Sequence, residues 1–261
     1  MSDPEAQAGA EPALRLVREG PIARLLIDRA DKRNAFNQAM WQLLPELVLR
    51  AVSDPAVRVL AIQSAQPGPF CAGADIAELL ANRDDEQWLA ANQAAINRAQ
   101  HVLARADKPV IAFIDGDCVG GGCGLALAAD IRVATPRARL GITPAKLGLV
   151  YPLHDTKLLV DLVGPGQAKR MLFTGQLLDA NEALRIGLVD EIAESTAHLE
   201  AAIAANSLHS TSRMKRFVRR VLDGQADEDA ETLAEFAAAF AGPDFLEGTS
   251  AFVAKRKPNF N

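Results

Sequence analysis

Three short, predominantly apolar segments constrain the fold of this chain more than any other feature. They cover residues 57–63, 110–114 and 131–134, and none of them has a regular polar face. Segments of this kind are typical of strands that are buried on both sides. Helical patterns separate them along the chain. The sequence therefore predicts an α/β fold in which mainly parallel strands are joined by crossover helices.

Other elements are expected on either side of this framework. Apolar residues at 14–18 and 23–28 flank Gly20-Pro21, which predicts a hairpin. Asn37 is expected to cap a helix that ends near residue 51. Further helices are expected up to about residue 103 and at 125–129. Later helical segments are expected at about 167–173, 180–186, 196–206, 212–222, 227–241 and 243–255.

The change from strands to helices divides the chain into three parts. Residues 1–12 are rich in Ala, Gly, Pro and acidic residues without periodicity, so we expect a disordered N-terminus. Residues 13–195 are expected to form the core, and residues 196–261 a C-terminal helical region.

The composition of the chain excludes several classes of protein. The chain has 261 residues and a formal net charge of -5, which gives no support to nucleic-acid binding. Its cysteines form no CxxC pair and no cluster with metal-ligand spacing, so we expect buried thiols and no metal. We find no leader peptide and no apolar run long enough for a membrane span, and expect a cytoplasmic protein.

Two loops rich in small residues are the first candidates for chemistry. Residues 70–76 read Phe-Cys-Ala-Gly-Ala-Asp-Ile, follow a strand and open a helix. The first amides of a helix lack internal partners, so they can hold a carbonyl oxygen that becomes negative. A tight strand-to-helix connection would explain the same pattern.

The second loop covers residues 116–124 and contains three consecutive glycines at 120–122. It carries neither the Lys-Ser/Thr ending of a phosphate loop nor a GxGxxG pattern. A run of glycines loses much backbone entropy on folding, and close approach to a ligand or partner would offset this cost. Together, the two loops can supply two converging N–H donors.

At these segments the chain resembles the crotonase superfamily, the enoyl-CoA hydratases and isomerases. The resemblance runs from about residue 14 to 255 and rests on segments in family order: 31–37, 70–76, 108–112, 120–132, 146–149, 174–175, 183–189 and 250–257. It implies a ClpP-like spiral of ββα units with a C-terminal helical region for trimerisation. It also implies an acyl-CoA thioester as substrate, a homotrimer or a hexamer, and no separate cofactor.

The resemblance also implies roles for individual residues. The backbone N–H groups of Ala74 and Gly121 would form the oxyanion hole for the thioester carbonyl. The residues expected along the CoA chain are Arg33, Ala35, Ala72, Asp75 and Ile76. Those expected at its nucleotide end, often from a neighbouring subunit, are Phe252 and Lys255.

The chain departs from the family where a hydratase has its carboxylates. The first glutamate position is Gly124 and the second is Ala145, while the aspartate of related isomerases would fall at Pro152. Hydration needs one group to deprotonate water and another to protonate carbon, and such help is typically worth about 10²–10⁴-fold.

A tyrosine remains near these positions. The segment from Thr143 to Tyr151 resembles the methylmalonyl-CoA decarboxylase branch, which has a tyrosine at this place and can have histidine where this chain has Ala74. Loss of CO₂ from a malonyl-type thioester leaves an enolate that two N–H donors stabilise without a base. Tyr151 would then orient the substrate carboxylate or protonate the carbanion.

Three functions remain open at this point. The first is an enzyme that works through an enolate, such as a decarboxylase. The second is a hydratase or isomerase with a displaced base, for which Glu78, Asp155 or His154 are candidates. The third is a protein that binds CoA thioesters without chemistry.

Overall fold

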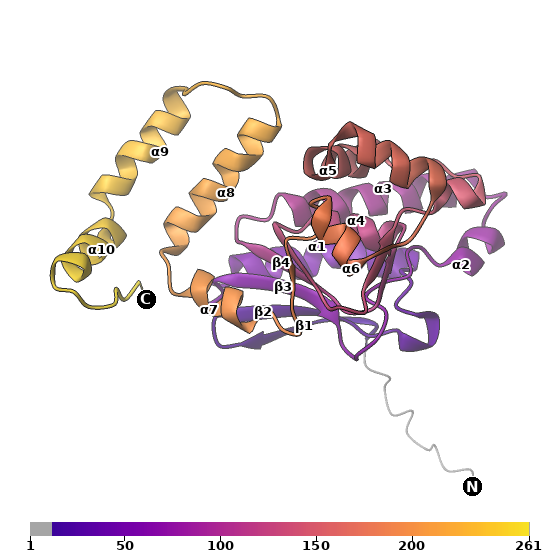
Figure 1. Ribbon diagram of the computed structural model, residues 1–261, viewed down its shortest axis with the longest axis horizontal. Coiled ribbons are helices and arrows are strands. Elements are labelled where there is room, and N and C mark those ends of the chain that lie inside the picture. The colour runs from indigo at the N-terminus through magenta and orange to yellow at the C-terminus, as the bar shows by residue number, and fades with distance from the viewer. Residues whose placement is uncertain (1–11, 261) are drawn as a thin grey trace, which may run out of the picture.

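The computed structural model describes residues 12–260 (Figure 1). The segment expected to be disordered, 1–12, therefore lies outside the described residues except for Pro12. The strands are β1 (Leu14–Glu19), β2 (Ile22–Ile27), β3 (Val59–Ser64), β4 (Val110–Ile114), β5 (Asp117–Val119), β6 (Ile131–Ala134), β7 (Arg139–Gly141), β8 (Leu178–Asp179) and β9 (Glu191–Ile192).

Helices account for most of the remaining chain. They are α1 (Gln38–Ser53), α2 (Ile76–Ala81), α3 (Glu86–Ala104), α4 (Gly121–Leu127), α5 (Leu153–Thr174), α6 (Ala180–Arg185), α7 (Ala197–Ala204), α8 (Leu208–Leu222), α9 (Ala230–Ala241) and α10 (Pro243–Val253), with short 3₁₀ turns η1 (Ala30–Lys32) and η2 (Pro144–Leu147). Asn37 caps α1 as predicted, because its side chain accepts a hydrogen bond from the Met40 amide.

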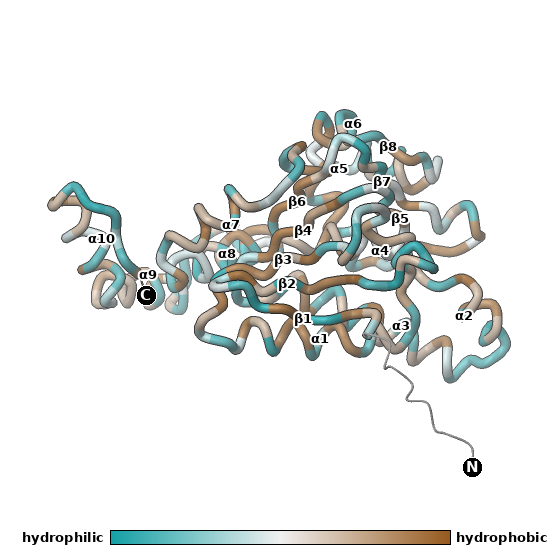
Figure 2. Tube along the Cα trace, turned by 90° about the horizontal axis from the view of Figure 1, so that it is seen from below, coloured by the Kyte–Doolittle hydropathy of each residue, from teal (hydrophilic) through white to brown (hydrophobic). Residues whose placement is uncertain are grey.

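The larger sheet has the strand order β1-β2-β3-β4-β6-β9. The predicted hairpin of β1 and β2 is antiparallel, and every later pair in this sheet is parallel. The central strands β3, β4 and β6 are mostly apolar (Figure 2), with Arg132 in β6 and with Gln63 and Ser64 at the end of β3 as exceptions. Their side chains are buried on both faces, which is what the apolar segments predicted.

A second, three-stranded sheet has the order β5-β7-β8. One strand of the larger sheet, one of the smaller sheet and a helix follow one another twice, as β4-β5-α4 and as β6-β7-α5. The preceding turn of the spiral has β3, an isolated parallel bridge from Cys71 to Cys118, and then α2. The predicted spiral of ββα units is therefore present.

The sequence patterns missed several parts of this architecture. Strands β5 and β7 have only three residues each, too few for a period to be recognised. Helix α5 begins at Leu153, whereas we expected a helix only after Pro165. The Gly164-Pro165 break obscured the first half, and Gly164 does have non-helical backbone angles of φ 72° and ψ 165°. Helix α4 also begins earlier than predicted, at Gly121.

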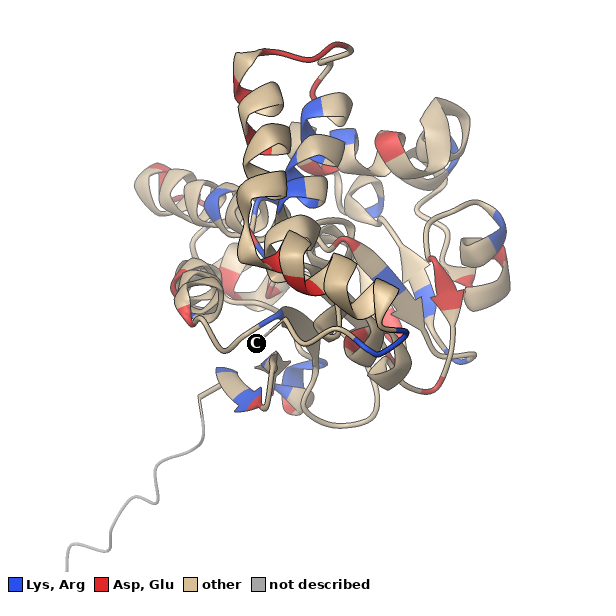
Figure 3. Ribbon diagram, turned by 90° about the vertical axis from the view of Figure 1, so that its left-hand side faces the viewer, with Lys and Arg blue, Asp and Glu red and all other residues tan. Residues whose placement is uncertain are grey.

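The C-terminal helices α8, α9 and α10 form an arm on one side of the sheets (Figure 1). Basic positions on one helix of the arm lie beside acidic positions on the next (Figure 3). Glu235 accepts from Arg213 and Arg216, and Arg220 pairs with Glu231. Large apolar side chains of the arm are exposed, among them Phe236, Phe240, Leu246, Phe252 and Val253. Exposed apolar surface of this extent is typical of a contact with another protein surface.

The described part of the chain contains neither a membrane-spanning helix nor a recognisable metal site. None of its helices is long and apolar enough to cross a membrane. Residues 12–260 also contain no group of three or more His, Cys, Asp and Glu side chains that could hold a metal ion. The three cysteines are buried and free, and burial raises the pKa of Cys71 to about 12.

Candidate active site

The spiral brings the two small-residue loops to equivalent positions of neighbouring turns. Cys71 pairs with Cys118, and Cys118 pairs with Leu140 in the β5–β7 ladder. Three residues after Cys71 lies Ala74, two residues before the start of α2, and three residues after Cys118 lies Gly121, the first residue of α4. Neighbouring parallel strands lie about 4.8 Å apart, so the two amides are brought close together by the register alone.

These two amides have no internal hydrogen-bond partner. Among the described residues, neither the N–H of Ala74 nor that of Gly121 donates to a backbone or side-chain acceptor. Their neighbours in the chain are paired, because Gly120 donates to Gly141 and Asp75 donates to Phe36. Two unused N–H groups, one in the loop before α2 and one at the start of α4, can stabilise an oxygen that gains negative charge.

Close packing explains the small residues around these amides. A Cβ atom on Gly73 would lie 2.9 Å from the Val119 carbonyl oxygen and 3.3 Å from the Gly121 nitrogen. A Cβ atom on Gly121 would lie 3.3 Å from the Trp41 ring and 3.7 Å from the Ala74 nitrogen. A side chain at Gly121 would therefore crowd the space between the two amides.

The segment that contains Arg33 and Ala35 lies against the first loop. The Ala72 amide donates to the Arg33 carbonyl over 3.1 Å, and the Phe36 amide donates to Gly73 over 2.8 Å. The Arg33 side chain pairs with Asp117, which belongs to the second loop. The structure thus brings together the residues expected along the CoA chain, although it does not test their contact with CoA.

Asp75 has an internal role in this arrangement. Its side chain caps α2 by accepting from Ala77 and Glu78, and it forms an ion pair of 2.8 Å with Arg29. Burial alone would raise the pKa of Asp75, but the Arg29 pair and these amide hydrogen bonds outweigh it and lower the pKa. Ile76 follows as the first residue of α2 and is 41% exposed.

Tyr151 contacts the second loop from the protein interior. Its side chain is buried, and its hydroxyl donates to the Gly120 carbonyl over 3.2 Å. That carbonyl belongs to the same peptide group as the Gly121 N–H. Burial raises the pKa of Tyr151 well above its usual value, helped by the nearby Cys123 and Asp155. The hydroxyl therefore keeps its proton and polarises the peptide group that carries the unused amide.

The space beside Gly124 is filled by two other polar side chains. A Cβ atom at this position would lie 2.5 Å from Gln100 Nε2 and 2.8 Å from Asp155 Oδ2. Asp155 Oδ1 lies 3.3 Å from His154 Nδ1. Sequence patterns named Asp155 and His154 as candidate bases but missed Gln100, which looks like an ordinary residue of α3.

Phe252 and Lys255 lie far from the small-residue loops of their own chain. Both are at the end of α10, and α10 and α2 occupy opposite ends of the molecule in two perpendicular views (Figures 1 and 2). Phe252 is 85% exposed. Only another copy of the chain could bring these residues to the loops, so their expected contact with CoA stays a prediction.

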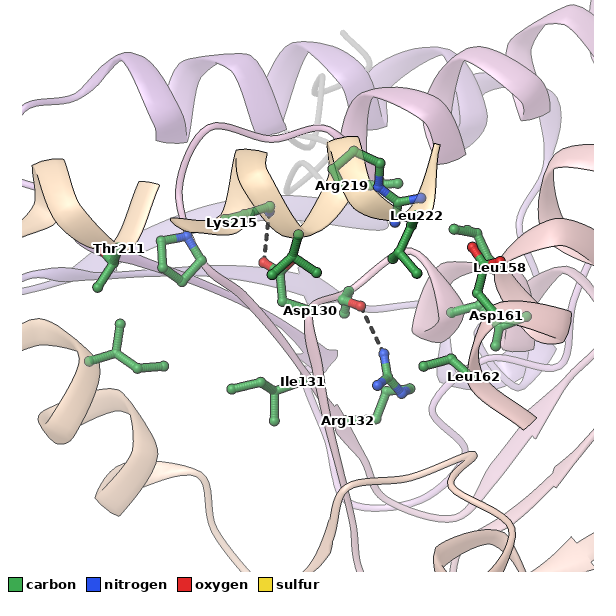
Figure 4. A pocket seen from close by; sticks show the side chains of 16 residues that line it. Asp130, Ile131, Arg132, Leu158, Asp161, Leu162, Thr211, Lys215, Arg219 and Leu222 are labelled. Atoms are coloured by element: carbon green, nitrogen blue, oxygen red, sulfur yellow. Dashed lines mark hydrogen bonds and ion pairs between the residues drawn. The ribbon is translucent and has the colours of Figure 1, made fainter. Parts of the chain in front are cut away.

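An apolar hollow of about 400 Å³ lies between α8 and the core (Figure 4). Its polar groups are already paired: Lys215 with Asp130 over 2.7 Å, and Arg132 with the Ala129 carbonyl over 2.8 Å. No residue of the two small-residue loops lines it. We therefore place the candidate active site at the loops and not in this hollow.

Comparison with known proteins shows which family the chain belongs to. The family model described as enoyl-CoA hydratase/isomerase matches residues 18–261. The chain belongs to this family. Its α/β spiral is the fold of the crotonase superfamily, as predicted.

Individual relatives share the whole length of the chain. A crotonyl-CoA hydratase from Syntrophomonas wolfei is 32% identical and is covered to 96%, against 94% of this chain. The crystal structure of an enoyl-CoA hydratase/isomerase family protein from Hyphomonas neptunium is 41% identical, with a TM-score of 0.91 and coverage of 96% of this chain and 98% of that one. An enoyl-CoA hydratase/carnithine racemase from Magnetospirillum magneticum is 31% identical, also with a TM-score of 0.91, and coverage is 97% of this chain and 96% of that one.

Proposed function

We propose that this enzyme forms a thioester enolate from an acyl-CoA by removing CO₂ from a malonyl-type CoA thioester. The observation that carries the proposal is the pair of unused amides, Ala74 and Gly121, at equivalent positions of adjacent turns. An enolate oxygen bound there would accept both hydrogen bonds, and the negative charge left by CO₂ would be stabilised where it develops. Coenzyme A is part of the substrate, and we expect no separate cofactor.

The carboxylates around the loops favour this reaction over hydration. Gly124 and Ala145 occupy the positions at which we place the two glutamates of a hydratase. Asp75 is committed to Arg29 and the start of α2. Glu78 accepts from the Gln38 amide at the start of α1, over 2.8 Å. Neither is free to activate water, and a nearby carboxylate would also repel the carboxylate of the substrate.

Tyr151 contributes through the peptide group of Gly120 and Gly121. The sequence suggested that its hydroxyl acts on the substrate carboxylate or the carbanion. A tyrosine has one O–H proton, and here this proton is donated to the Gly120 carbonyl. We therefore propose that Tyr151 is a positioning residue that strengthens the Gly121 N–H as a donor.

The arm supports the expected trimer or hexamer. Its exposed apolar side chains would be covered by another copy of the chain. Such a contact would also bring Phe252 and Lys255 of one copy towards the CoA-binding loops of the next. We propose a homotrimer or a dimer of trimers on these grounds.

The experiment that tests the proposed reaction measures CO₂ release from methylmalonyl-CoA and ethylmalonyl-CoA. We expect propionyl-CoA or butyryl-CoA to form in equal amount to the CO₂. A protein that binds both thioesters but releases no CO₂ would contradict the reaction and leave a binding function.

A hydratase with a displaced base is the second candidate, and the buried carboxyl of Asp155 is the observation that favours it. The loss of absorbance when crotonyl-CoA is hydrated distinguishes the two functions. If the decarboxylase proposal is correct, we expect crotonyl-CoA to be hydrated slowly or not at all. A turnover number of about 10–10³ s⁻¹, the usual range of enzymes, would refute the decarboxylase proposal.

Removing the Tyr151 hydroxyl tests the role of this residue. We expect Tyr151→Phe to lower kcat about 10-fold, since the lost hydrogen bond is worth roughly 1.4 kcal/mol in the transition state. KM should stay within about twofold, because the site itself is unchanged. An unchanged kcat would remove Tyr151 from the mechanism.

Tyr151 is the only tyrosine of the chain, which allows a matched control. Growth on 3-fluorotyrosine places a fluorine atom beside this hydroxyl and changes no other residue. The fluorine makes the hydroxyl more acidic and therefore a stronger hydrogen-bond donor. We expect the fluorinated enzyme to retain at least the wild-type kcat. A loss as large as that of Tyr151→Phe would mean that packing, and not the hydrogen bond, is what the site needs.

A further inference from the structure

Three buried polar atoms without hydrogen-bond partners lie together next to the candidate active site. They are Nε2 and Oε1 of Gln100 and Oδ2 of Asp155. Gln100 is 1% exposed and Asp155 is 2% exposed. Nearly all buried polar atoms in proteins are paired, so an exception calls for an explanation, and a catalytic role is one of them.

These atoms meet at one point beside helix α4. All three lie within 2.8 Å of the position that a Cβ atom on Gly124 would take. Gly124 therefore leaves room for Gln100 from α3 and Asp155 from α5. Gln100 is close enough to lower the pKa of Asp155, yet its amide does not meet the geometry of a hydrogen bond with Oδ2.

The same point lies close to the unused amides. Gly121 and Gly124 are three residues apart on α4, so they share a face of the helix about 5–6 Å apart. Asp155 is also near enough to Tyr151 to contribute to the raised pKa of the hydroxyl that contacts Gly120. A thioester whose oxygen is held by the Gly121 amide would therefore have its α-carbon in the neighbourhood of Asp155.

We propose that the carboxyl group of Asp155, held beside Gln100 in the space next to Gly124, is the acid that protonates the α-carbon of the enolate. This inference rests on the proposed enolate reaction and names its proton donor. The Cα–CO₂ bond breaks, and its electron pair enters the enolate. The O–H bond of Asp155 then breaks as the Cα–H bond forms, which leaves Asp155 as a carboxylate.

The surroundings of Asp155 suit this role. Burial raises the pKa of Asp155, although hydrogen bonding and charge from His154 partly offset the effect. A raised pKa favours the protonated carboxyl, which has a proton to give and does not repel the carboxylate of a malonyl-type substrate. His154 contacts Oδ1 and borders a surface hollow with Asn97 and Pro152. It therefore offers a route by which the proton from solvent is restored.

The test measures exchange of the α-protons of propionyl-CoA and butyryl-CoA in D₂O by proton NMR. By microscopic reversibility, the acid that protonates the α-carbon also removes its proton from the product thioester. We expect the wild type to exchange these protons and Asp155→Asn to do so at least 100-fold more slowly. Asp161→Asn is the matched control, because Asp161 lies on the same helix in an ion pair with Lys157, and its exchange rate should equal that of the wild type.

Thermal unfolding separates a chemical role from a structural one. Asp155→Asn keeps the shape and removes a buried carboxyl that lacks a partner at one oxygen, so we expect Tm to rise by about 2–4 °C. Slower exchange together with a higher Tm supports the proposal. Wild-type exchange in Asp155→Asn would overturn it, as would a fall of both exchange and Tm, or a wild type that exchanges neither thioester.

CO₂ release and proton exchange, measured together, test the role of Asp155 and the proposed decarboxylation separately. If the wild type releases CO₂ from methylmalonyl-CoA and Asp155→Asn does so equally fast with normal exchange, the reaction stands and the role of Asp155 is refuted. If no CO₂ is released but exchange depends on Asp155, the reaction is refuted and the role of Asp155 stands.

Discussion

Replacing Gly121 by proline is expected to lower kcat at least 100-fold while the protein remains folded. Proline has no N–H, so the substitution removes one of the two donors proposed for the enolate oxygen. Loss of one such donor typically costs about 10²–10³-fold. Gly121 is the first residue of α4, where proline fits the helix backbone, although its Cβ atom would lie 3.3 Å from the Trp41 ring and 3.7 Å from the Ala74 nitrogen.

A second proline controls for the effect on helix structure. Ala230 is the first residue of α9, is exposed and lies on the arm away from the loops. Ala230→Pro should retain wild-type kcat, and both variants should unfold within a few degrees of the wild type. A folded Gly121→Pro enzyme with full activity would refute the role of the Gly121 amide.

Replacing Gly122 by alanine is expected to lower the free energy of unfolding by at least about 3 kcal/mol, the upper range for overpacking. The added Cβ atom would lie 2.3 Å from the Cys71 carbonyl oxygen and 2.7 Å from the Cys71 Cβ. The first of these is a backbone atom in the bridge between Cys71 and Cys118, so the two loops must separate. Activity should be lost with stability, because the two amides move apart.

Gly166→Ala is the matched control for Gly122→Ala. A Cβ atom there would meet nothing within 4 Å, and Gly166 lies inside α5. Gly166→Ala should leave stability unchanged or raise it by up to about 1 kcal/mol, because alanine favours helix more than glycine does. Urea unfolding of both variants measures the difference. Equal stability of Gly122→Ala and the wild type would show that the loops have more room than the structure indicates.

Much of the fold was predictable because it depends on local signals. The buried strands β3, β4 and β6 are predominantly apolar in sequence, and Asn37 caps α1 through its own side chain. Strands β5 and β7 were not predictable, because three residues carry no usable period. They nevertheless set the register that aligns Ala74 with Gly121.

The candidate site was predictable only in part, for a related reason. The small-residue loops and Tyr151 can be recognised along the chain. The contacts that give them a role are non-local: Tyr151 reaches Gly120, and Asp155 meets Gln100 beside Gly124. No pattern within one helix signals that Gln100 lies in the core next to a carboxyl group from another helix.

The central claim is that two backbone amides converge on one thioester oxygen. The infrared stretching frequency of a ¹³C-labelled thioester carbonyl tests it most directly, with butyryl-CoA bound to the wild type and to Gly121→Pro. We expect the frequency to fall on binding to the wild type, and to fall clearly less in the variant. A carbonyl that binds to the wild type with the frequency it has in water would contradict the account.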